Sequence, residues 1–473
     1  MTLEDYLRQN AQCYPDKVAA VCDGRQITYS ELYAAVCERA QQLPCGQVIA
    51  FRSSQSIDFL ITYFAIHLAG SIAAPLERDT PEPLYQQIAN LPRPLQRRGV
   101  PTDIRHRQAL LPFGEAGRDF ADILYTTGTT GRSKGAIVSH RAIIANAENL
   151  IEGQGYTHDL VFIVSGPLNH IGSLSKVWPV VLTGGTLYIL EGMKDLEAFF
   201  RALDYPAPKA ATFLVPATIR MLLQLSGDRL AAYAHRLDFI ESGAAPLPRA
   251  DMLRLCQLLP QTRLYNTYAS TETGIIATYN YNDGRCLEGC LGRPMSHSRV
   301  TIIPEQSSPI PAIAPTRSLS HSLSADGLIA CQGDTLMSGY AGDSADEAPI
   351  TILTSDLGYL DAEGMLHLTG RRGDTINVGG YKVAPTEVEA AAMLLPQVSD
   401  CICIAAPHSV VGTALKLLVV TADGIKLDKR SLARSLATRL EGYKVPQLYE
   451  QVESVRRTYN GKLDRKYYRQ QDK

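Results

Sequence analysis

The stretch "LYTTGTTGRSKG", Leu124–Gly135, decides how this chain is interpreted. It holds four threonines, one serine, three glycines and two cations in twelve residues. Backbone N–H groups presented by glycine-rich turns, together with small hydroxyls and cations, form a concave site for phosphate oxygens. The preceding "DILYTT" is strand-like, and "SHRAIIANAENLI" predicts a helix that begins near Ser139. The segment therefore lies where α/β proteins bind phosphates, although a solvated turn would have a similar composition.

The loop matches neither of the two commonest nucleotide motifs. Five residues after Gly128, where the Walker form requires glycine, the chain has Ser133. The spacing of the glycines does not fit GxGxxG either. A phosphate loop of another family is needed.

Composition narrows the class of protein. A length of 473 residues exceeds what one core of about 250–300 residues supports, which predicts at least two domains. The 46 basic and 48 acidic residues give a net charge of −2, which argues against a nucleic-acid partner. The N-terminus "MTLEDYLRQN" has no secretory pattern, and no clean apolar run reaches the roughly 20 residues of a membrane span. We expect a cytoplasmic protein whose ten cysteines are reduced thiols.

Strand-length apolar runs alternate with amphipathic helical segments over the first 300 residues, which predicts an α/β fold of layered sheets and helices. The Pro- and Ser-rich segment 304–327 predicts a surface loop. "GRRGDTINVGG", 370–380, has four glycines and predicts a hinge. After it, a helix entered near Pro385 and the strand-like "DCICIAAP" and "LKLLVVTA" predict a small α+β domain.

The motifs of this chain resemble those of the adenylate-forming superfamily, which contains acyl- and aryl-CoA ligases, luciferases and the adenylation domains of peptide synthetases. "YTTGTTGRSKG" is similar to the family's signature loop. Further similar segments follow the family's order along nearly the whole chain: "ITYSEL", "HLAGSIAAPL", "PLNHIGSL", "YASTE", "MSGY", "TSDLGYLDAEGMLHLTGRRGDTINVGGYKVAPTEVE" and "NGKLDR". The resemblance implies a large N-terminal AMP-binding domain, residues 1–370, and a small mobile α+β lid domain, residues 371–473.

The resemblance also implies how ATP is bound. The β- and γ-phosphates are assigned to Thr126, Thr127, Gly128, Thr129, Thr130, Gly131 and Lys134. The α-phosphate is assigned to Thr271 and Mg²⁺ to Glu272, since Mg²⁺ suits one carboxylate with phosphate oxygens and waters. The nucleoside is assigned to Gly243, Ala244, Ala245, Asn266, Tyr268, Asp356 and Arg371.

Three further roles follow from the matched motifs. Lys462 of "NGKLDR" is implied as the catalytic cation, because a flexible ammonium can bridge an attacking carboxylate and the α-phosphate. Gly379 and Gly380 are implied to line a passage for the pantetheine of coenzyme A, and His170 to gate that passage. One departure is Gly373, at a hinge position where the family usually has Asp or Lys.

The sequence constrains the identity of the carboxylic acid substrate less than it constrains the residues assigned to ATP. Ile163 stands where we align the aspartate that binds an α-ammonium in amino-acid-activating relatives, which predicts an acid without an α-amine. Candidate pocket residues flank the motifs, namely Asn169, His170, Ser173, Ser242, Gly243, Thr267 and Ile275. Small or polar side chains suit an aryl or a short or medium acyl acid.

The resulting prediction is a free-standing, AMP-forming acid–CoA ligase. An o-succinylbenzoate–CoA ligase and an enzyme that loads a carrier protein remain alternatives within the class. A catalytically silent nucleotide-binding module is the alternative from another class.

Overall fold

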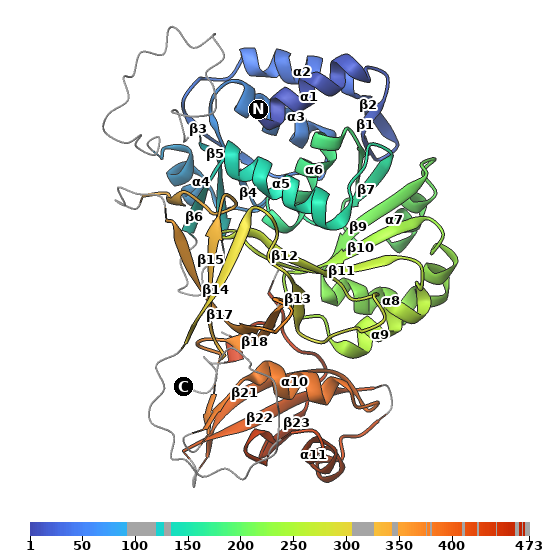
Figure 1. Ribbon diagram of the computed structural model, residues 1–473, viewed down its shortest axis with the longest axis vertical. Helices are drawn as coiled ribbons and strands as arrows, with labels where there is room; N and C mark the ends of the chain where they lie inside the picture. The colour runs from blue at the N-terminus through green and yellow to red at the C-terminus, as the bar shows by residue number, and fades with distance from the viewer. Residues whose placement is uncertain are drawn as a thin grey trace.

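The computed structural model describes residues 1–91, 120–126, 134–304, 326–342, 349–374, 376–378, 381–408, 412–422, 425–440, 442–458, 463–465 and 467–468. A large N-terminal part of sheets and helices lies above a smaller C-terminal part in Figure 1. The predicted α/β class is confirmed. The loop predicted over 304–327 lies outside the described residues, except at its two ends.

An eight-stranded sheet forms the centre of the large domain. Its strand order is β12-β11-β10-β9-β7-β8-β1-β2; the six strands from β11 to β1 are parallel to one another, and the edge strands β12 and β2 are antiparallel to them. All five residues of β7 are buried, as expected of a parallel strand covered on both faces. The strands are β1 Val18–Cys22, β2 Arg25–Thr28, β7 Leu160–Val164, β8 Thr186–Ile189, β9 Lys209–Leu214, β10 Leu237–Ser242, β11 Arg263–Ser270 and β12 Gly274–Asn280.

Two five-stranded sheets complete the β structure of this domain. One has the order β16-β6-β5-β4-β3, and the other, β13-β18-β17-β15-β14, lies between the eight-stranded sheet and the small domain in Figure 1. The first consists of β3 Val48–Arg52, β4 Ile72–Leu76, β5 Phe120–Thr126, β6 Lys134–Ser139 and β16 Gly339–Tyr340. The second consists of β13 Cys290–Gly292, β14 Ser298–Pro304, β15 Gly327–Gly333, β17 Thr351–Leu360 and β18 Leu366–Arg371.

Helices cover these sheets, and the helix predicted to begin near Ser139 does so. Thr28 begins α2 with a capping box to Glu31, and the Ser139 hydroxyl accepts from the backbone N–H of Ala142 at the start of α5. Within the described residues, no helix is both long and apolar enough to cross a membrane. The helices of this domain are α1 Leu3–Cys13, α2 Tyr29–Gln41, α3 Ile57–Leu68, α4 Glu82–Ala89, α5 His140–Gln154, α6 Ile171–Thr183, α7 Leu196–Leu203, α8 Pro216–Ala232 and α9 Arg249–Leu258.

The C-terminal residues form the predicted small α+β unit with a core of its own. Val388 of its first helix packs in one cluster with Leu415 and Val419 of the sheet and with Leu432 of the last helix. The three-stranded sheet has the order β21-β22-β23. Its elements are β19 Ile376–Val378, β20 Tyr381–Val383, α10 Pro385–Met393, β21 Val398–His408, β22 Gly412–Thr421, α11 Lys429–Ala437, the 3-10 turn η2 Gly442–Lys444 and β23 Leu448–Gln451.

A charged network is buried in the core of the large domain. The His67 ring on α3 lies between two carboxylates, with Nδ1 2.9 Å from Glu4 Oε1 and Nε2 2.9 Å from Asp122 Oδ1. The Tyr63 hydroxyl donates to Asp122 and accepts from the indole N–H of Trp178. Burial alone would lower the pKa of His67, but the charges of Asp122 and Glu4 raise it to about 10. The network therefore carries an imidazolium between two anions.

Candidate active site

Three residues predicted to bind the nucleoside meet beside the end of β11. The Tyr268 hydroxyl donates to Asp356 Oδ2 over 2.8 Å, and Arg371 Nε lies 3.1 Å from Asp356 Oδ1. Asp356 and Arg371 are paired in register on β17 and β18, which fixes the ion pair. Burial, followed by the charge of Asp356, raises the pKa of Tyr268, so the phenol stays a donor. One aromatic ring, one carboxylate and one guanidinium thus stand together.

A second cluster forms around Glu272, in the turn between β11 and β12. The Tyr340 hydroxyl donates to Glu272 Oε1 over 3.1 Å, and Lys134 Nζ lies 4.8 Å from the centroid of the Tyr340 ring. Tyr340 is held there because β16 pairs with β6, directly after the phosphate-loop segment. The "MSGY" motif thereby connects the predicted phosphate lysine with the predicted Mg²⁺ carboxylate. Thr271 lies in the same turn, next to Glu272.

The segment that follows β10 holds Gly243, Ala244 and Ala245, three residues predicted beside the nucleoside. A Cβ atom on Gly243 would lie 3.1 Å from the Thr267 carbonyl oxygen and 3.3 Å from the Phe213 ring, so glycine permits a close approach. Ala244 has φ +68°, a left-handed conformation that costs a residue with a side chain on the order of 1 kcal/mol. The exposed Ala244 and the partly exposed Ala245 follow the buried Gly243. At two positions predicted beside the nucleoside, the backbone therefore approaches its neighbours closely at Gly243 and takes a left-handed conformation at Ala244.

His170 has a partner that the sequence did not indicate. It stands directly before α6, and its Nε2 lies 2.6 Å from Oε1 of Glu77, which directly follows β4. Burial would raise the pKa of Glu77, but the hydrogen bond and charge of His170, with a hydrogen bond from Asn169, lower it. The predicted gate is therefore a histidine hydrogen-bonded to Glu77, and Asn169 contacts the same carboxylate.

The remaining pocket predictions fall on buried side chains, several of which serve the scaffold. Thr267 shares hydrogen bonds with Thr278 and Gln154, and Ile275 packs in the main core. Asn266, predicted beside the nucleoside, donates its amide to the Cys290 carbonyl. Ser173 and Ser242 are buried near the start of α6 and the end of β10.

Ile163 is the fourth of the five residues of β7 and is fully buried in a core cluster that includes Phe199 and Leu214. The inference from Ile163, an acid without an α-amine, stays a prediction.

A buried ion pair that sequence reasoning missed stands beside these residues. Lys176 Nζ on α6 donates to Glu241 Oε1 on β10 over 2.7 Å, and the two side chains are 2% and 0% exposed. Burial lowers the pKa of Lys176 below its usual value, although the charge of Glu241 and the hydrogen bond to Glu241 act in the opposite direction. The signal available in the sequence was a lysine inside an otherwise apolar helix, "LSKVWPVVL".

Several predicted residues lie outside the described part of the chain. They are Thr127, Gly128, Thr129, Thr130, Gly131, Gly379, Gly380 and Lys462. Thr126 is described in its backbone only, where it pairs with Lys134 at the ends of β5 and β6. The assignments of these residues stay predictions.

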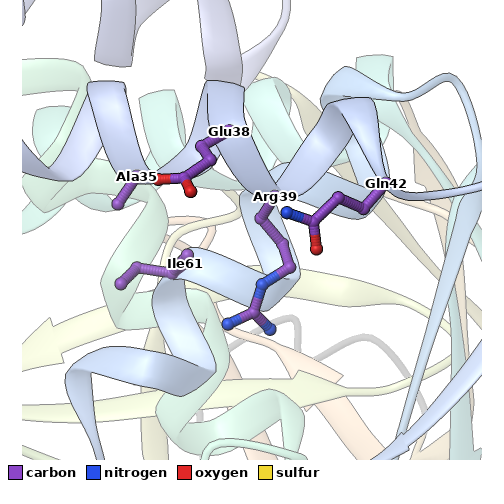
Figure 2. A pocket seen from close by; sticks show the side chains of 5 residues that line it. All are labelled: Ala35, Glu38, Arg39, Gln42 and Ile61. Carbon is purple, nitrogen blue, oxygen red and sulfur yellow. The ribbon is translucent and has the colours of Figure 1, made fainter.

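One groove of about 220 Å³ lies elsewhere, on the helical layer at the N-terminal side. Figure 2 shows its lining, with Ala35, Glu38 and Arg39 from α2, Gln42 directly after it, and Ile61 from α3. Arg39 is tied there to Thr62 and Asp58. None of the predicted site residues lines this groove.

The residues present fit a nucleotide with its metal. Glu272 offers a partly exposed carboxylate beside Lys134, and a single carboxylate with phosphate oxygens and waters is the usual environment of Mg²⁺ in ATP sites. Asp356 offers oxygens that can accept two ribose hydroxyls. These features define the class, an α/β protein whose groups at the end of β11 suit a nucleotide and which carries a small α+β domain after β18.

The comparisons identify the family within that class. The model of the AMP-binding enzyme family matches residues 7–94 and 96–341, and the model of its C-terminal domain matches residues 387–462. The chain belongs to the AMP-binding enzyme family, and it is an AMP-forming acid–CoA ligase that uses ATP, Mg²⁺ and coenzyme A.

Similar proteins span the chain at modest identity. An indoleacetate–CoA ligase of Aromatoleum aromaticum is 26% identical over 516 residues, covering 99% of this chain and 98% of its own. A malonate–CoA ligase of Homo sapiens is 25% identical over 528 residues, covering 96% and 90%. The structure of ATP-bound MatB from Rhodopseudomonas palustris superposes with a TM-score of 0.80 at 22% identity, covering 100% of this chain and 99% of that one. That likeness shows the fold.

Proposed function

We propose that the residues gathered around the end of β11 bind ATP for the activation of an aryl or a short or medium acyl acid, which is then transferred to coenzyme A. The observation that supports this proposal is a set of contacts between residues that lie far apart in the sequence. Glu272 contacts Tyr340, Tyr340 contacts Lys134, and Tyr268 contacts Asp356. These pairs join four separate motifs, carried by three sheets, around the end of β11.

The proposed first step joins two anions. A carboxylate oxygen of the acid attacks the α-phosphorus of ATP, the bond from that phosphorus to the oxygen bridging it to the β-phosphate breaks, and pyrophosphate leaves. Lys134 and the loop before it neutralise the leaving group, while Thr271 and Lys462 act at the α-phosphate. Mg²⁺ held by Glu272 supplies further neutralisation when bound. Tyr268, Asp356 and Arg371 fix the nucleoside so that the phosphates meet these groups.

The proposed second step forms the thioester. The coenzyme A sulfur attacks the carbonyl carbon of the acyl-adenylate, the bond from that carbon to the phosphate oxygen breaks, and AMP leaves. We assign residues 1–370 to the adenylation domain and residues 371–473 to a lid that turns between the steps. Gly379 and Gly380 line the pantetheine passage, and His170 with Glu77 stands at its inner end.

The acid class rests on two supports. One relative acts on an aryl acid and another on a short acid, as their names state. The Phe213 ring closely approaches Gly172 and Gly243, since a Cβ atom on either would lie 3.2 or 3.3 Å from it, and a pocket closed by this ring suits a compact acid.

Two assays test the proposal. Hydroxylamine trapping of adenylates across a panel of aryl and acyl acids is expected to give a hydroxamate with one compact class. The trapped acid is then offered with coenzyme A or with a pantetheinylated carrier protein, and we expect thioester on coenzyme A. Preference for the carrier protein, or for o-succinylbenzoate alone, would establish one of the two alternatives instead.

A further inference from the structure

The buried pair Lys176–Glu241 lies on the sheet face that α6 covers. Glu241 on β10 is in register with Phe213 on β9 and with Tyr265 on β11, so these three side chains form a row. Lys176 Nζ lies 5.2 Å from the centroid of the Phe213 ring. Burying two charges in such a row stabilises the fold less than well-packed apolar groups would, so we expect the pair to have a role other than stability.

The row reaches the proposed acid pocket through Phe213. A Cβ atom on Gly172 would lie 3.2 Å from this ring, and one on Gly243 would lie 3.3 Å from it. Gly172 is two residues beyond His170, and Lys176 is six residues beyond it, about 9 Å along the helix axis. Phe213 and Gly172 are partly exposed, whereas Lys176 and Glu241 are closed off. The ion pair therefore lies against the Phe213 ring, on the side away from the exposed surface of the proposed acid pocket.

Polar atoms around this ion pair lack partners among the described residues. Glu241 Oε2 accepts no hydrogen bond, and the hydroxyl oxygen of Ser242 has no partner, although both residues are 0% exposed. The hydroxyl of Tyr156 also lacks a partner there, and Glu241 is close enough for its charge to add to the effect of burial in raising the pKa of this phenol. Lys176 has one acceptor, Glu241 Oε1, for its three N–H donors. Buried groups of this kind are normally satisfied by a bound water or a ligand.

The unsatisfied groups specify the chemistry of their occupant. It must donate to Glu241 and can accept from Lys176 at the same time. A hydroxyl does both, a hydrocarbon does neither, and a second carboxylate would accept from Lys176 but face Glu241 with like charge.

We propose that Lys176 and Glu241 select an acid that carries a hydroxyl group at the end distant from its carboxylate. This inference rests on the proposed function and names the substrate class of its acid pocket. Without acid, a water molecule occupies the place of the hydroxyl. An acid with only hydrocarbon there displaces that water without replacing its hydrogen bonds, which is the situation that gives strong discrimination.

The test uses matched acids that differ only by the distal hydroxyl. The pairs are benzoate and 4-hydroxybenzoate, cinnamate and 4-hydroxycinnamate, and hexanoate and 6-hydroxyhexanoate, with adipate as a dicarboxylate arm. Acid-dependent exchange of labelled pyrophosphate into ATP gives kcat/KM for each acid. We expect the hydroxylated member of the best pair to exceed its partner by at least about 100-fold. Adipate is expected to fall below 6-hydroxyhexanoate.

A double variant separates selection from folding. K176M with E241L replaces the pair by apolar groups of similar size, a change that folded proteins commonly tolerate. We expect the preference to fall below threefold or to reverse, mainly through the KM of the acid, with an unchanged KM for ATP. The matched control is K416M with E450L, the same substitutions at an exposed pair of the small domain, 2.7 Å apart, which should keep the preference of the unaltered enzyme.

The outcomes distinguish this inference from the function beneath it. If no acid supports exchange, the proposed function fails and the inference with it. If acids support exchange but the hydroxyl changes kcat/KM by less than threefold, or adipate is preferred, only the inference is overturned. If the double variant keeps the full preference, Lys176 and Glu241 do not select the hydroxyl.

Discussion

Replacing His67 by glutamine is the most demanding test of the core, because it removes the only described cation between two buried carboxylates. Glu4 and Asp122 each lie 2.9 Å from a ring nitrogen of His67, and all three side chains are at most 6% exposed. Removing one partner of a buried ion pair costs about 3–5 kcal/mol, because the other charge is left without compensation. His67 serves two partners, so H67Q should lower the free energy of unfolding by at least this amount, out of a typical total of about 5–15 kcal/mol.

The pH dependence gives this prediction a signature. His67 has its pKa raised from 6.5 to about 10, so its stabilisation is complete below pH 6.5 and is lost as the pH rises toward 10. Burial would raise the pKa of Glu4, but the charge of His67, its hydrogen bond and His140 lower it from 4.5 to about 2. The stabilisation by Glu4 is complete above pH 4.5 and is lost as the pH falls toward 2. The penalty of H67Q should therefore be largest between pH 4.5 and 6.5.

The protein has a single tryptophan, Trp178, which contacts this buried network, so its fluorescence can follow unfolding there. Trp178 donates to Tyr63, and Tyr63 donates to Asp122, so its fluorescence reports on the network during urea unfolding. H235Q is the control, because the His235 side chain is exposed and its one described hydrogen bond is to the Ala232 carbonyl in its own turn; it should change the free energy of unfolding by less than about 0.5 kcal/mol. An H67Q protein as stable as this control at pH 6 would refute the reasoning.

Four further predictions concern the site and the domain contact. D356N should lower kcat/KM for ATP by about 10- to 100-fold in pyrophosphate exchange with the KM of the acid unchanged, since it weakens charged hydrogen bonds; an altered acid KM alone would contradict the assignment. The E272A variant should need a much higher Mg²⁺ concentration to reach the same exchange rate. An unchanged Mg²⁺ titration would contradict the assignment of the metal to Glu272. K462A should suppress adenylation far more than thioester formation from supplied adenylate, whereas equal losses would argue against its role. D400N should speed proteolysis between the domains, because Asp400 pairs with Arg220 across them over 3.3 Å; cleavage at the original rate would show that other contacts hold the small domain.

The sequence predicted the site in pieces but not its contacts. Glu272 and Lys134 were each assigned from a motif, yet their connection runs through Tyr340, which depends on β16 pairing with β6. His170 was assigned without Glu77, because that pair joins the end of β4 to the start of α6, 93 residues apart. Strand periodicity gives local structure, whereas sheet order decides which strand ends meet.

Lys176 and Glu241 were missed because each is a charge within a largely apolar segment. Only the packing of α6 against the strands brings them within hydrogen-bonding distance.

The residues around Gly373 indicate where the small domain would turn. Arg371 ends β18 and is paired with Asp356 of the large domain, while Asp374 lies 3.5 Å from Arg465, whose guanidinium forms two hydrogen bonds to Glu389 of the small domain. Within these four residues, the side-chain contacts thus change from the large domain, at Arg371, to the small domain, at Asp374. Gly373, between them, has φ +90°, a conformation that a residue with a side chain rarely adopts. A family hinge residue with a side chain would be strained in this turn, so we expect the pivot of this enzyme to depend on backbone freedom at Gly373 rather than on a charged side chain.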